Sequence, residues 1–500
     1  MRRERPGLPG GSAVNRFMEE NHGPRPYDAV IAEIAEYATR DQPLSTLAYA
    51  TARWSLADAL GSAMLALRHP SCQRLLGGLV PGVSVSRGAR VPGTHFELDP
   101  IEASFNLATM IRWLDYNDTW LDREWGHPSD NVGAILMVAD WISRQGSQPA
   151  LTMQDVLTAM IKAHEIQGVL SMSVALNRVG YDHVWWVKVA STAVVTAMLG
   201  GDREAVARAL SHAWIDGGSL RSYRHAPDTG SRKSWAAGDA ASRAVRLSLI
   251  ALRGEMGYPC ALTAPTWGFQ DVVLHGDTVR LARPLGNYVM ENILFKVAYP
   301  AEFHGQTAIE CALRLYPLVR ARLDEIGTIH IETQESAMRI INKTGPLANP
   351  ADRDHCLQFM VAAALATGHL DDESYSQRTA EAPRIDALRA CMTVEENPAF
   401  SRAYLDPGRR AIANAITIRF KDGTTTPRVE VEYPLGHRRR RTEALPLLGK
   451  KFRHNVSSRF SGQQRERLLA LFDAGDAWDA MPVPDFVQLW IPPEEPEAGA

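Results

Sequence analysis

The spacing of apolar residues restricts the fold of this chain more than any other feature. From Ile101 to Gly254, apolar residues recur at intervals of three and four, the period of an α-helix with one buried face. Turn-forming residues interrupt this pattern at Gly126–Asp130, Ser143–Gln148, Gly180–Asp182 and His225–Gly230. The segments between these breaks predict helices of about 12–20 residues, a usual length in packed helical bundles.

The pattern differs on either side of this region. Residues 26–70 also read as helices, whereas residues 71–100 are rich in Gly and Val and predict a loop with a short strand. The spacing of apolar residues changes near Gly257. Short β-rich or alternating runs follow at Trp267–Val273, Thr278–Leu281, Thr328–Thr333, Ile416–Phe420 and Arg428–Tyr433, with the hairpin signal K-D-G-T between the last two. Helical spacing occurs at Glu302–Leu323 and returns at Gln463–Phe472.

These patterns predict a mostly α-helical protein with an α+β insertion. We expect a large all-helical domain built from both chain ends, residues 1–279 and 438–500, and a smaller α+β lid domain at residues 280–437. The length of 500 residues agrees with two domains, because one core rarely grows to that size. Residues 1–22 are expected to be a flexible tail, and residues 492–500 a disordered one.

Charge and hydropathy argue against two classes of partner. The formal net charge is −3, and no stripe of basic residues interleaved with aromatic ones occurs, so we expect no nucleic acid partner. The run Arg438–Arg441 is expected to be solvated or to face an acidic substrate. No window has the length and hydropathy of a membrane span. The N-terminus lacks the apolar core of a signal peptide, and Glu4 and the early prolines weaken its reading as a mitochondrial presequence.

The cysteines indicate the compartment and the kind of chemistry. Five cysteines are scattered along the chain without a C-x-x-C pair, which argues against a disulfide framework and favours a reducing cytoplasm. The same scatter argues against an iron–sulfur cluster, and neither a zinc-ligand spacing nor a Gly-rich phosphate loop occurs. The sequence therefore predicts neither a metal site nor a cofactor.

Lysine is scarce in this chain. Only eight of the 54 basic residues are Lys, so the chain uses Arg for surface charge. A Lys that is kept is then more often one whose compact amine is needed, although chance can retain any single one. Lys233 and Lys296 are two candidates for such a role.

The densest group of reactive side chains lies in Arg112–Gly133, between two apolar helical runs. If Leu107–Leu121 is one helix, Asp115, Asp118 and Thr119 share a face, because residues three and four apart are neighbours on a helix. Carboxylates that solvate a helix surface are the ordinary alternative. Two tryptophans beside the polar face favour a lined pocket instead.

His127 follows in the turn G-H-P-S-D, immediately before a second helix expected at Val132–Trp141. Ser129 or Asp130 is expected to cap that helix. Backbone N–H groups and the positive dipole end of a helix N-terminus favour an anionic ligand at such a place. An ordinary turn residue is the alternative interpretation of His127.

At these residues the chain resembles the 2-methylcitrate dehydratase branch of the MmgE/PrpD family. The family signature contains an Asp-x-x-Asp-Thr block, here Asp115–Thr119, followed by His-Pro-Ser, here His127–Ser129. The resemblance covers most of the chain apart from its two ends. It implies a large helical domain and a smaller lid with the active site between them, and a homodimer. The implied activity is a cofactor-independent hydro-lyase that converts 2-methylcitrate to 2-methyl-cis-aconitate in propionate catabolism, and that could also accept citrate or cis-aconitate.

Other segments match the same family. His183 begins an apolar helix, where a turn role and a ligand role are equally compatible with the residues alone, and the resemblance favours the ligand role. Lys296 and His304 lie in F-K-V-A-Y-P-A-E-F-H-G, at the expected junction of the two domains, where pockets tend to form. A loop Lys and a helix-capping His are the alternatives. The resemblance favours a site role more for Lys296 than for His304.

The segment Arg221–Asp239 places several cations around a Pro/Gly turn between apolar helices. Such a display suits a ligand with several carboxylates, although basic loops are more often simply solvated. The resemblance implies an active-site role for Lys233 in this segment. In a further matching segment, Asn349–Met360, Phe359 stands where some relatives have Tyr, so a proton-donor role there is in doubt, and His355 is expected to be structural.

Dehydration of a tricarboxylate needs a base for a C–H proton, an acid for the departing hydroxyl, and cations for the developing charge. We expect a neighbouring Asp115 to favour protonated His127 and the helix dipole to oppose it. The protonated ring could give a proton to the leaving hydroxyl and the neutral ring could take one from carbon, and we favour His127 as the acid. The resemblance implies that the catalytic residues are Asp115, Thr119, His127, Lys233 and Lys296, and that Asp118, His183, Arg224, His225, Arg232 and His304 bind the substrate. The alternatives are a relative acting on another polycarboxylate, such as a cis-aconitate decarboxylase or an epimerase, and a non-catalytic binding protein.

Overall fold

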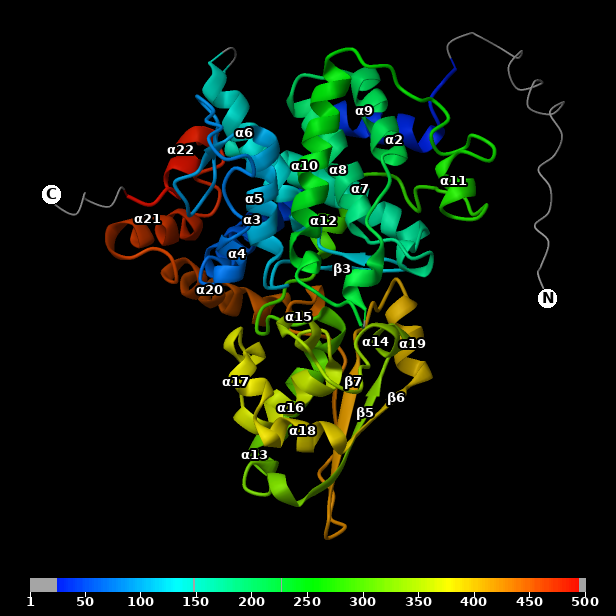
Figure 1. The fold of residues 1–500 in the computed structure, drawn as a ribbon, viewed down its shortest axis with the longest axis vertical. Helices are drawn as coiled ribbons and strands as arrows, with labels where there is room; N and C mark the ends of the chain where they lie inside the picture. Colours follow the sequence, from blue (N-terminus) through cyan, green and yellow to red (C-terminus); the bar gives the residue numbers. More distant parts are fainter. Residues whose placement is uncertain (1–24, 147–148, 226, 494–500) are drawn as a thin grey trace.

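A computed structural model describes residues 25–146, 149–225 and 227–493, so the two predicted tails lie largely outside the described residues. The chain forms a helical part, drawn in the upper half of Figure 1, and an α+β part below it. The mostly helical architecture with a small α+β part confirms the predicted fold class. No helix among the residues described is long and apolar enough to cross a bilayer.

The helical part draws on both ends of the chain, as Figure 1 shows by its blue-to-green and red ribbons. Most of its N-terminal helices agree with the predicted helical periods, although the helix predicted at Leu107–Leu121 ends at Arg112 and the short helix Phe269–Val272 lies in a run predicted as β-rich. The N-terminal helices are α2 (Ala29–Thr39), α3 (Thr46–Ala66), α4 (Pro70–Gln73), α5 (Pro100–Arg112), α6 (Val132–Gln145), α7 (Met153–Ser173), α8 (Val184–Met198), α9 (Arg203–Ile215), α10 (Arg232–Leu252), α11 (Phe269–Val272) and α12 (Tyr288–Asn292). The C-terminal ones are α20 (Arg441–Ser457), α21 (Gly462–Asp473) and α22 (Val483–Gln488).

Small residues let the helices around α5 approach closely. A Cβ on Gly238 of α10 would lie 2.3 Å from Thr109 Oγ1, and one on Gly133 of α6 would lie 2.6 Å from the Cβ of Ala108. Only glycine fits at such distances without displacing a neighbour. Helix α5 is therefore held between α6 and α10, which fixes the direction in which its C-terminal end, Arg112, projects.

The α+β part contains a four-stranded sheet in the order β6–β5–β7–β8. Strand β5 (Ile326–Thr333) pairs in parallel with β6 (Met392–Glu396) and antiparallel with β7 (Asn414–Phe420), which continues through a hairpin into β8 (Val429–Val431). The predicted strands and hairpin of this region are thus confirmed. The helices of this part are α13 (Gln306–Val319), α14 (Glu335–Ile340), α15 (Pro350–Arg353), α16 (Leu357–Thr367), α17 (Gln377–Ala380), α18 (Pro383–Ala390) and α19 (Pro398–Leu405).

Two short hairpins lie in the helical part. Strands β1 (Ala89–Arg90) and β2 (Glu97–Leu98) pair in the segment expected to be a loop with a short strand.

The β-rich runs Trp267–Val273 and Thr278–Leu281, by contrast, do not form strands, so that prediction is wrong. Phe269 of the first run instead packs edge-on against two tryptophans, with ring centroids 4.8 and 4.9 Å away. Packing of one aromatic ring outweighs strand propensity where no partner strand is at hand.

Buried apolar side chains form two large cores. One combines residues 30–279 with Met290 and residues 452–490, and the other combines residues 294–431 with Leu121 and Trp125. A smaller cluster around Trp120 and Phe295 fills the junction between them.

The run Arg438–Arg441 leads the chain back from the sheet to α20. Arg438 and Arg439 are exposed, as predicted, but all four side chains also bind the protein. Their acceptors are Asn292, the carbonyl oxygens of Gly408 and Ile293, and Glu310, which Arg440 Nη1 approaches to 2.9 Å. The run therefore fastens the returning chain across the junction of the two parts.

Candidate active site

Helix α5 ends at Arg112, and Asp115 then adopts a left-handed backbone with φ of 50°. Asp tolerates this conformation better than most residues. The prediction of one helix over Leu107–Leu121 is therefore wrong, and Asp115, Asp118 and Thr119 lie in a connecting loop. The break is stabilised by tertiary contacts, because the Asp115 carboxylate turns back to bind the Arg112 guanidinium.

A hairpin returns the chain from this loop to His127. Strand β3 (Trp120–Leu121) pairs antiparallel with β4 (Trp125–Gly126). On the other side of β3, Thr119 and Leu294 exchange two backbone hydrogen bonds of 2.8 and 2.9 Å. This bridge joins the loop to the segment after α12, and it brings Lys296 beside Asp115.

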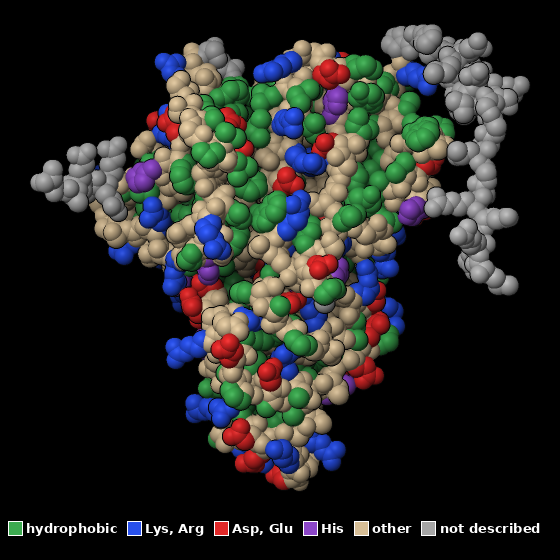
Figure 2. All heavy atoms as spheres, in the orientation of Figure 1, with side chains coloured by type: hydrophobic (Ala, Val, Ile, Leu, Met, Phe, Trp, Pro, Cys, Tyr) green, Lys and Arg blue, Asp and Glu red, His purple; other side chains and the backbone are tan. Residues whose placement is uncertain are grey.

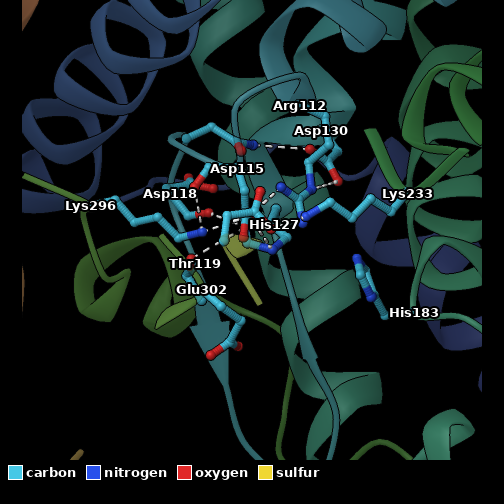
Figure 3. Close-up of polar contacts among 12 residues, drawn as sticks. Arg112, Asp115, Asp118, Thr119, His127, Asp130, His183, Lys233, Lys296 and Glu302 are labelled. Carbon is cyan, nitrogen blue, oxygen red and sulfur yellow. Dashed lines mark hydrogen bonds and ion pairs between the residues drawn. The ribbon is translucent and has the colours of Figure 1, made fainter. Parts of the chain in front are cut away.

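The Asp115 carboxylate is the centre of a buried charge cluster, shown in Figure 3. Lys296 Nζ donates to the carbonyl oxygen and to Oδ1 of Asp115, each at 2.6 Å, and His127 Nε2 lies 3.4 Å from the same Oδ1. Burial alone raises the pKa of the Asp115 carboxyl, but Arg112 and Lys296 outweigh burial and hold that pKa well below its usual value. Asp115 is therefore an ionised carboxylate in the folded protein.

The hydrogen bonds of His127 determine which ring nitrogen carries the proton. Nδ1 lies 2.7 Å from the Asp118 carbonyl oxygen and 3.2 Å from Thr119 Oγ1. Because a carbonyl can only accept, Nδ1 carries a proton, and in the neutral ring Nε2 keeps its lone pair. Burial, followed by the charges of Arg112 and Lys296, lowers the pKa of His127 well below its usual value. Asp115 favours the protonated form, as predicted, but burial, Arg112 and Lys296 together outweigh it, so the neutral ring is favoured.

Asp118 anchors the loop. Its Oδ1 accepts from the Ser129 backbone N–H at 2.9 Å, and its Oδ2 lies 2.9 Å from both Ser55 Oγ and His164 Nε2. Between His127 and α6 the chain forms a short 3₁₀ turn, Pro128–Asn131. No side chain caps α6, so the predicted capping by Ser129 or Asp130 is wrong. The side-chain amide of Asn117 donates to Ser129 Oγ and to Asp130 Oδ1 instead.

Lys233 reaches the same region from the first turn of α10. Its Nζ binds Asp354 and lies 3.0 Å from His355 Nδ1. Lys233 and Asp354 line a cavity of about 470 Å³ between the helical part and the α+β part. Burial lowers the pKa of the Lys233 ammonium, although Asp354 opposes this, so Lys233 releases a proton more easily than an exposed Lys.

His183 lies next to His127, with ring centroids 5.7 Å apart. It is the N-terminal residue before α8, as predicted. Its Nδ1 atom lies 3.1 Å from Asp182 Oδ1, and its Nε2 atom is buried without a partner. Burial lowers the pKa of His183 well below its usual value, so its ring is neutral. Arg224 is buried nearby and forms a two-point ion pair with Asp182.

Three predicted binding residues are exposed or already have protein partners. His225 is exposed, and the Arg232 side chain is 37% exposed, with its guanidinium 3.1 Å from Asp239 and stacked on Trp235. His304 is fully buried and already partnered, because its ring nitrogens lie 2.7 Å from Glu302 Oε1 and 3.1 Å from the Tyr404 hydroxyl. Arg232 and His304 therefore have structural partners in this state.

Comparison with known proteins agrees with this arrangement. The family model described as the MmgE/PrpD N-terminal domain matches residues 31–282, and that of the MmgE/PrpD C-terminal domain matches residues 299–474. The chain belongs to the MmgE/PrpD family. It is 56% identical to the 2-methylcitrate dehydratase of Cupriavidus necator, over 93% of this chain and 97% of that protein. It is 54% identical to that of Escherichia coli K12, over 93% and 98%, and 48% identical to the mitochondrial one of Yarrowia lipolytica, over 97% and 95%.

Several residues of this MmgE/PrpD site were not singled out from the sequence. Arg112 opens the polar segment but reads as the end of a helix, and Asp354 and His355 are distant in sequence from the residues they bind. The scarcity of lysine was the sequence feature that could have pointed to buried residues at the site. Five of the eight lysines are buried, and these are Lys162, Lys188, Lys233, Lys296 and Lys451. Lys451 Nζ donates to the carbonyl oxygens of Tyr116 and Lys296 at 2.6 and 2.7 Å, so it holds together the two segments that carry Asp115 and Lys296.

The described residues contain no group of three His, Cys, Asp or Glu side chains arranged to hold a metal ion. The prediction that the reaction needs no metal stays a prediction, and it is tested below.

We predict that Asp115→Asn lowers stability strongly at neutral pH, by about 3–5 kcal/mol, because it leaves Arg112 and Lys296 as uncompensated buried cations. Asn keeps the left-handed backbone. Since the folded-state pKa of Asp115 is depressed, its contribution is complete above the unfolded-state pKa and is lost as the pH falls through the folded-state value. The difference in denaturation midpoint between wild type and variant should therefore shrink below about pH 5.

Asp473→Asn is the control, because the Asp473 side chain is 63% exposed in a surface pair with Arg453. Such pairs contribute about 0–1 kcal/mol, so this variant should melt close to the wild type. An Asp115→Asn protein with wild-type stability at pH 7 would contradict the assigned role of the cluster.

Proposed function

We propose that this protein is a hydro-lyase that dehydrates 2-methylcitrate to 2-methyl-cis-aconitate in the methylcitrate cycle of propionate catabolism. One observation carries the proposal: a histidine whose neutral form is favoured, a paired carboxylate and buried cations meet in one cluster, in a chain similar over nearly its whole length to proteins named 2-methylcitrate dehydratase. Of the cations, Lys233 lines an interdomain cavity. The substrate is a tricarboxylate, and buried cations are what such a ligand requires.

We propose His127 as the base. Its neutral ring carries a proton on Nδ1, so Nε2 can accept the proton that leaves carbon next to a carboxylate. Asp115 lies 3.4 Å from Nε2 and would stabilise the imidazolium that forms. Thr119 and the Asp118 carbonyl hold the ring orientation. This reverses the acid role favoured from the sequence, because burial and two cations make the neutral form the resting one.

We propose Lys233 as the proton donor to the departing hydroxyl. Its lowered pKa and its position on the wall of the 470 Å³ cavity favour this role. Lys296 is fully buried and bound to Asp115, so it acts by keeping Asp115 ionised and in place. We further propose that the α+β part forms a lid, since the cavity lies between the two parts and its closure would exclude water from the site. Of the predicted lid residues 280–437, those of α12 pack instead on α3 and α7 of the helical part.

The test of this function is an assay of the purified, chelator-treated protein in air, with 2-methylcitrate and citrate side by side. Dehydration raises ultraviolet absorbance as the alkene forms, and we expect this with 2-methylcitrate at an undiminished rate after chelation. Release of carbon dioxide would identify a decarboxylase instead. Absence of both signals would indicate a non-catalytic binding protein. Loss of activity on chelation, restored by iron or zinc, would overturn the cofactor-independent mechanism.

We predict that His127→Asn lowers turnover of 2-methylcitrate by about two orders of magnitude or more, the usual size of a general acid–base contribution. The variant should keep the wild-type circular dichroism spectrum and melting temperature. His369→Asn is the matched control, because the His369 side chain is 62% exposed in the α+β part, and it should retain near-wild-type turnover. A folded His127→Asn protein with normal turnover would make His127 a turn residue.

We propose that the protein is a cytoplasmic homodimer. All five cysteines are unpaired thiols, which fits a reducing compartment. Figure 2 shows hydrophobic side chains over much of the helical half of the visible face, and more mixed charge on the α+β half. Large exposed apolar residues gather near the end of α9 and around α11. They are Ile215, Leu220, Met256, Trp267 and Val272, of which Trp267 is 84% exposed. Exposed apolar patches of this kind mark interfaces, and paired identical patches make a two-fold dimer.

We predict that the wild type elutes at roughly twice its 55.1 kDa chain mass in size-exclusion chromatography with light scattering. Trp267→Ser should shift it toward the monomer without lowering its melting temperature beyond that change of state. Leu405→Ser, at a 64% exposed apolar residue of the α+β part, should leave the mass unchanged. A monomeric wild type would contradict the proposal.

A further inference from the structure

Arg221 is held inside the helical part without a partner for its charge. It begins the 3₁₀ turn Arg221–Arg224 between α9 and α10, and its backbone N–H donates to the Gly180 carbonyl oxygen at 3.0 Å. The residue is only 5% exposed, and its guanidinium lies 5.5 Å from the centroid of the Trp125 ring. The backbone contact and the aromatic ring fix the position of this cation.

The guanidinium of Arg221 makes no hydrogen bond or ion pair with the described residues. Its Nε and Nη1 atoms are buried and have no partner. Arg224, three residues later, is a contrasting case, because it binds both oxygens of Asp182. Buried arginines are normally paired in this way, since an unpaired buried charge costs several kcal/mol. The free N–H groups of Arg221 therefore need an acceptor that the chain does not supply.

Two carboxylates lie near Arg221, and neither binds it. Both oxygens of Asp182 are taken by Arg224. Glu124 accepts from the backbone N–H of Asn177 at 2.6 Å and from that of Trp125 at 3.3 Å. Burial raises the pKa of Glu124 to about 7, although Arg221 opposes the rise, so Glu124 is only partly ionised at neutral pH. A ligand carboxylate would supply both the missing charge and the missing acceptor.

Arg221 also lies close to the proposed reaction centre. It is near enough to His183 to lower the pKa of that ring, and His183 is adjacent to His127. The Nε2 atom of His183 is likewise buried without a partner, whereas its Nδ1 atom lies 3.1 Å from Asp182 Oδ1. Unpartnered polar nitrogens, on Arg221 and on Nε2 of His183, thus lie beside the proposed base, on residues other than those that bind Asp115.

We infer that Arg221 binds a carboxylate of the polycarboxylate substrate and orients the carbon that loses its proton toward His127. This inference rests on the proposed function and adds a binding residue to it. The planar guanidinium suits a carboxylate, which can accept two parallel hydrogen bonds from it. Arg221, and not the half-exposed Arg232 of the same segment, is then the residue of this basic stretch that contacts the substrate directly.

The test uses binding of unreactive ligands to the full-length protein. Propane-1,2,3-tricarboxylate carries the three carboxylates of citrate but no hydroxyl, so it cannot be dehydrated. Glutarate lacks its central carboxylate, and methylsuccinate lacks one terminal carboxylate. Calorimetric Kd values for the three ligands are measured with wild type, Arg221→Gln and Arg221→Lys. Arg243→Gln is the control, because Arg243 forms surface pairs on α10.

We expect Arg221→Gln to weaken binding of the tricarboxylate by about ten- to hundredfold, the loss typical of a charge-assisted hydrogen bond. Arg221→Lys should recover part of this affinity, and Arg243→Gln should bind like the wild type. For one of the two truncated ligands the difference between wild type and Arg221→Gln should vanish, because that ligand lacks the carboxylate that Arg221 binds. A merely structural Arg221 would weaken all three ligands equally.

Equal weakening of all three ligands, unchanged binding of all three, or absence of tricarboxylate binding to the wild type would each overturn the inference. Failure of the proposed function looks different. If 2-methylcitrate is not dehydrated but tricarboxylate binding still depends on Arg221 in the expected way, the carboxylate site stands and the reaction must be another one. If dehydration proceeds normally in Arg221→Gln with unchanged KM, the function stands and the inference does not.

Discussion

The buried carboxylate of Asp115 is the interaction on which the rest of the site depends. It binds Arg112 at the end of α5 and Lys296 in the segment after α12, and it lies 3.4 Å from His127. Removing two cations and a carboxylate from water is costly, and the cluster persists because the three charges satisfy one another. The same cluster joins the helical part to the segment that leads into the α+β part, so stability and site geometry have a common origin.

How far sequence patterns predict this molecule depends on the range of the interactions involved. The helical and alternating periods predict the two kinds of architecture, because those periods record which face of each element is buried. The break after Arg112 is not predicted, since residues 107–121 have helical spacing throughout. Its cause is the left-handed Asp115, whose side chain binds Lys296, far away in sequence. The sequence pattern around Asp115 gives no information about a partner so distant in sequence.

The same distinction applies within the site. The Asp-x-x-Asp-Thr and His-Pro-Ser blocks indicate the loop and His127, but they do not distinguish a side chain that faces a ligand from one that holds the loop. Asp118 has both carboxylate oxygens engaged by the protein, whereas Arg221 has none of its guanidinium hydrogens engaged by the described residues. Lysine scarcity was informative because burial of an ammonium requires a specific acceptor, as Lys451 finds in Asp58.

The protonation state of His127 depends on all the charges of the cluster and not only on its neighbour Asp115. A histidine beside a carboxylate is expected to be protonated, yet burial, Arg112 and Lys296 lower its pKa and leave a neutral ring. A site that holds several cations and few free carboxylates in this way is electrostatically incomplete by itself. A polycarboxylate ligand would complete it, and the ligand's charge would raise the proton affinity of His127 at the moment when a base is needed. The unpartnered nitrogens, Nε2 of His183 and Nε and Nη1 of Arg221, are therefore consistent with a site whose lowest free energy is reached only with its substrate bound.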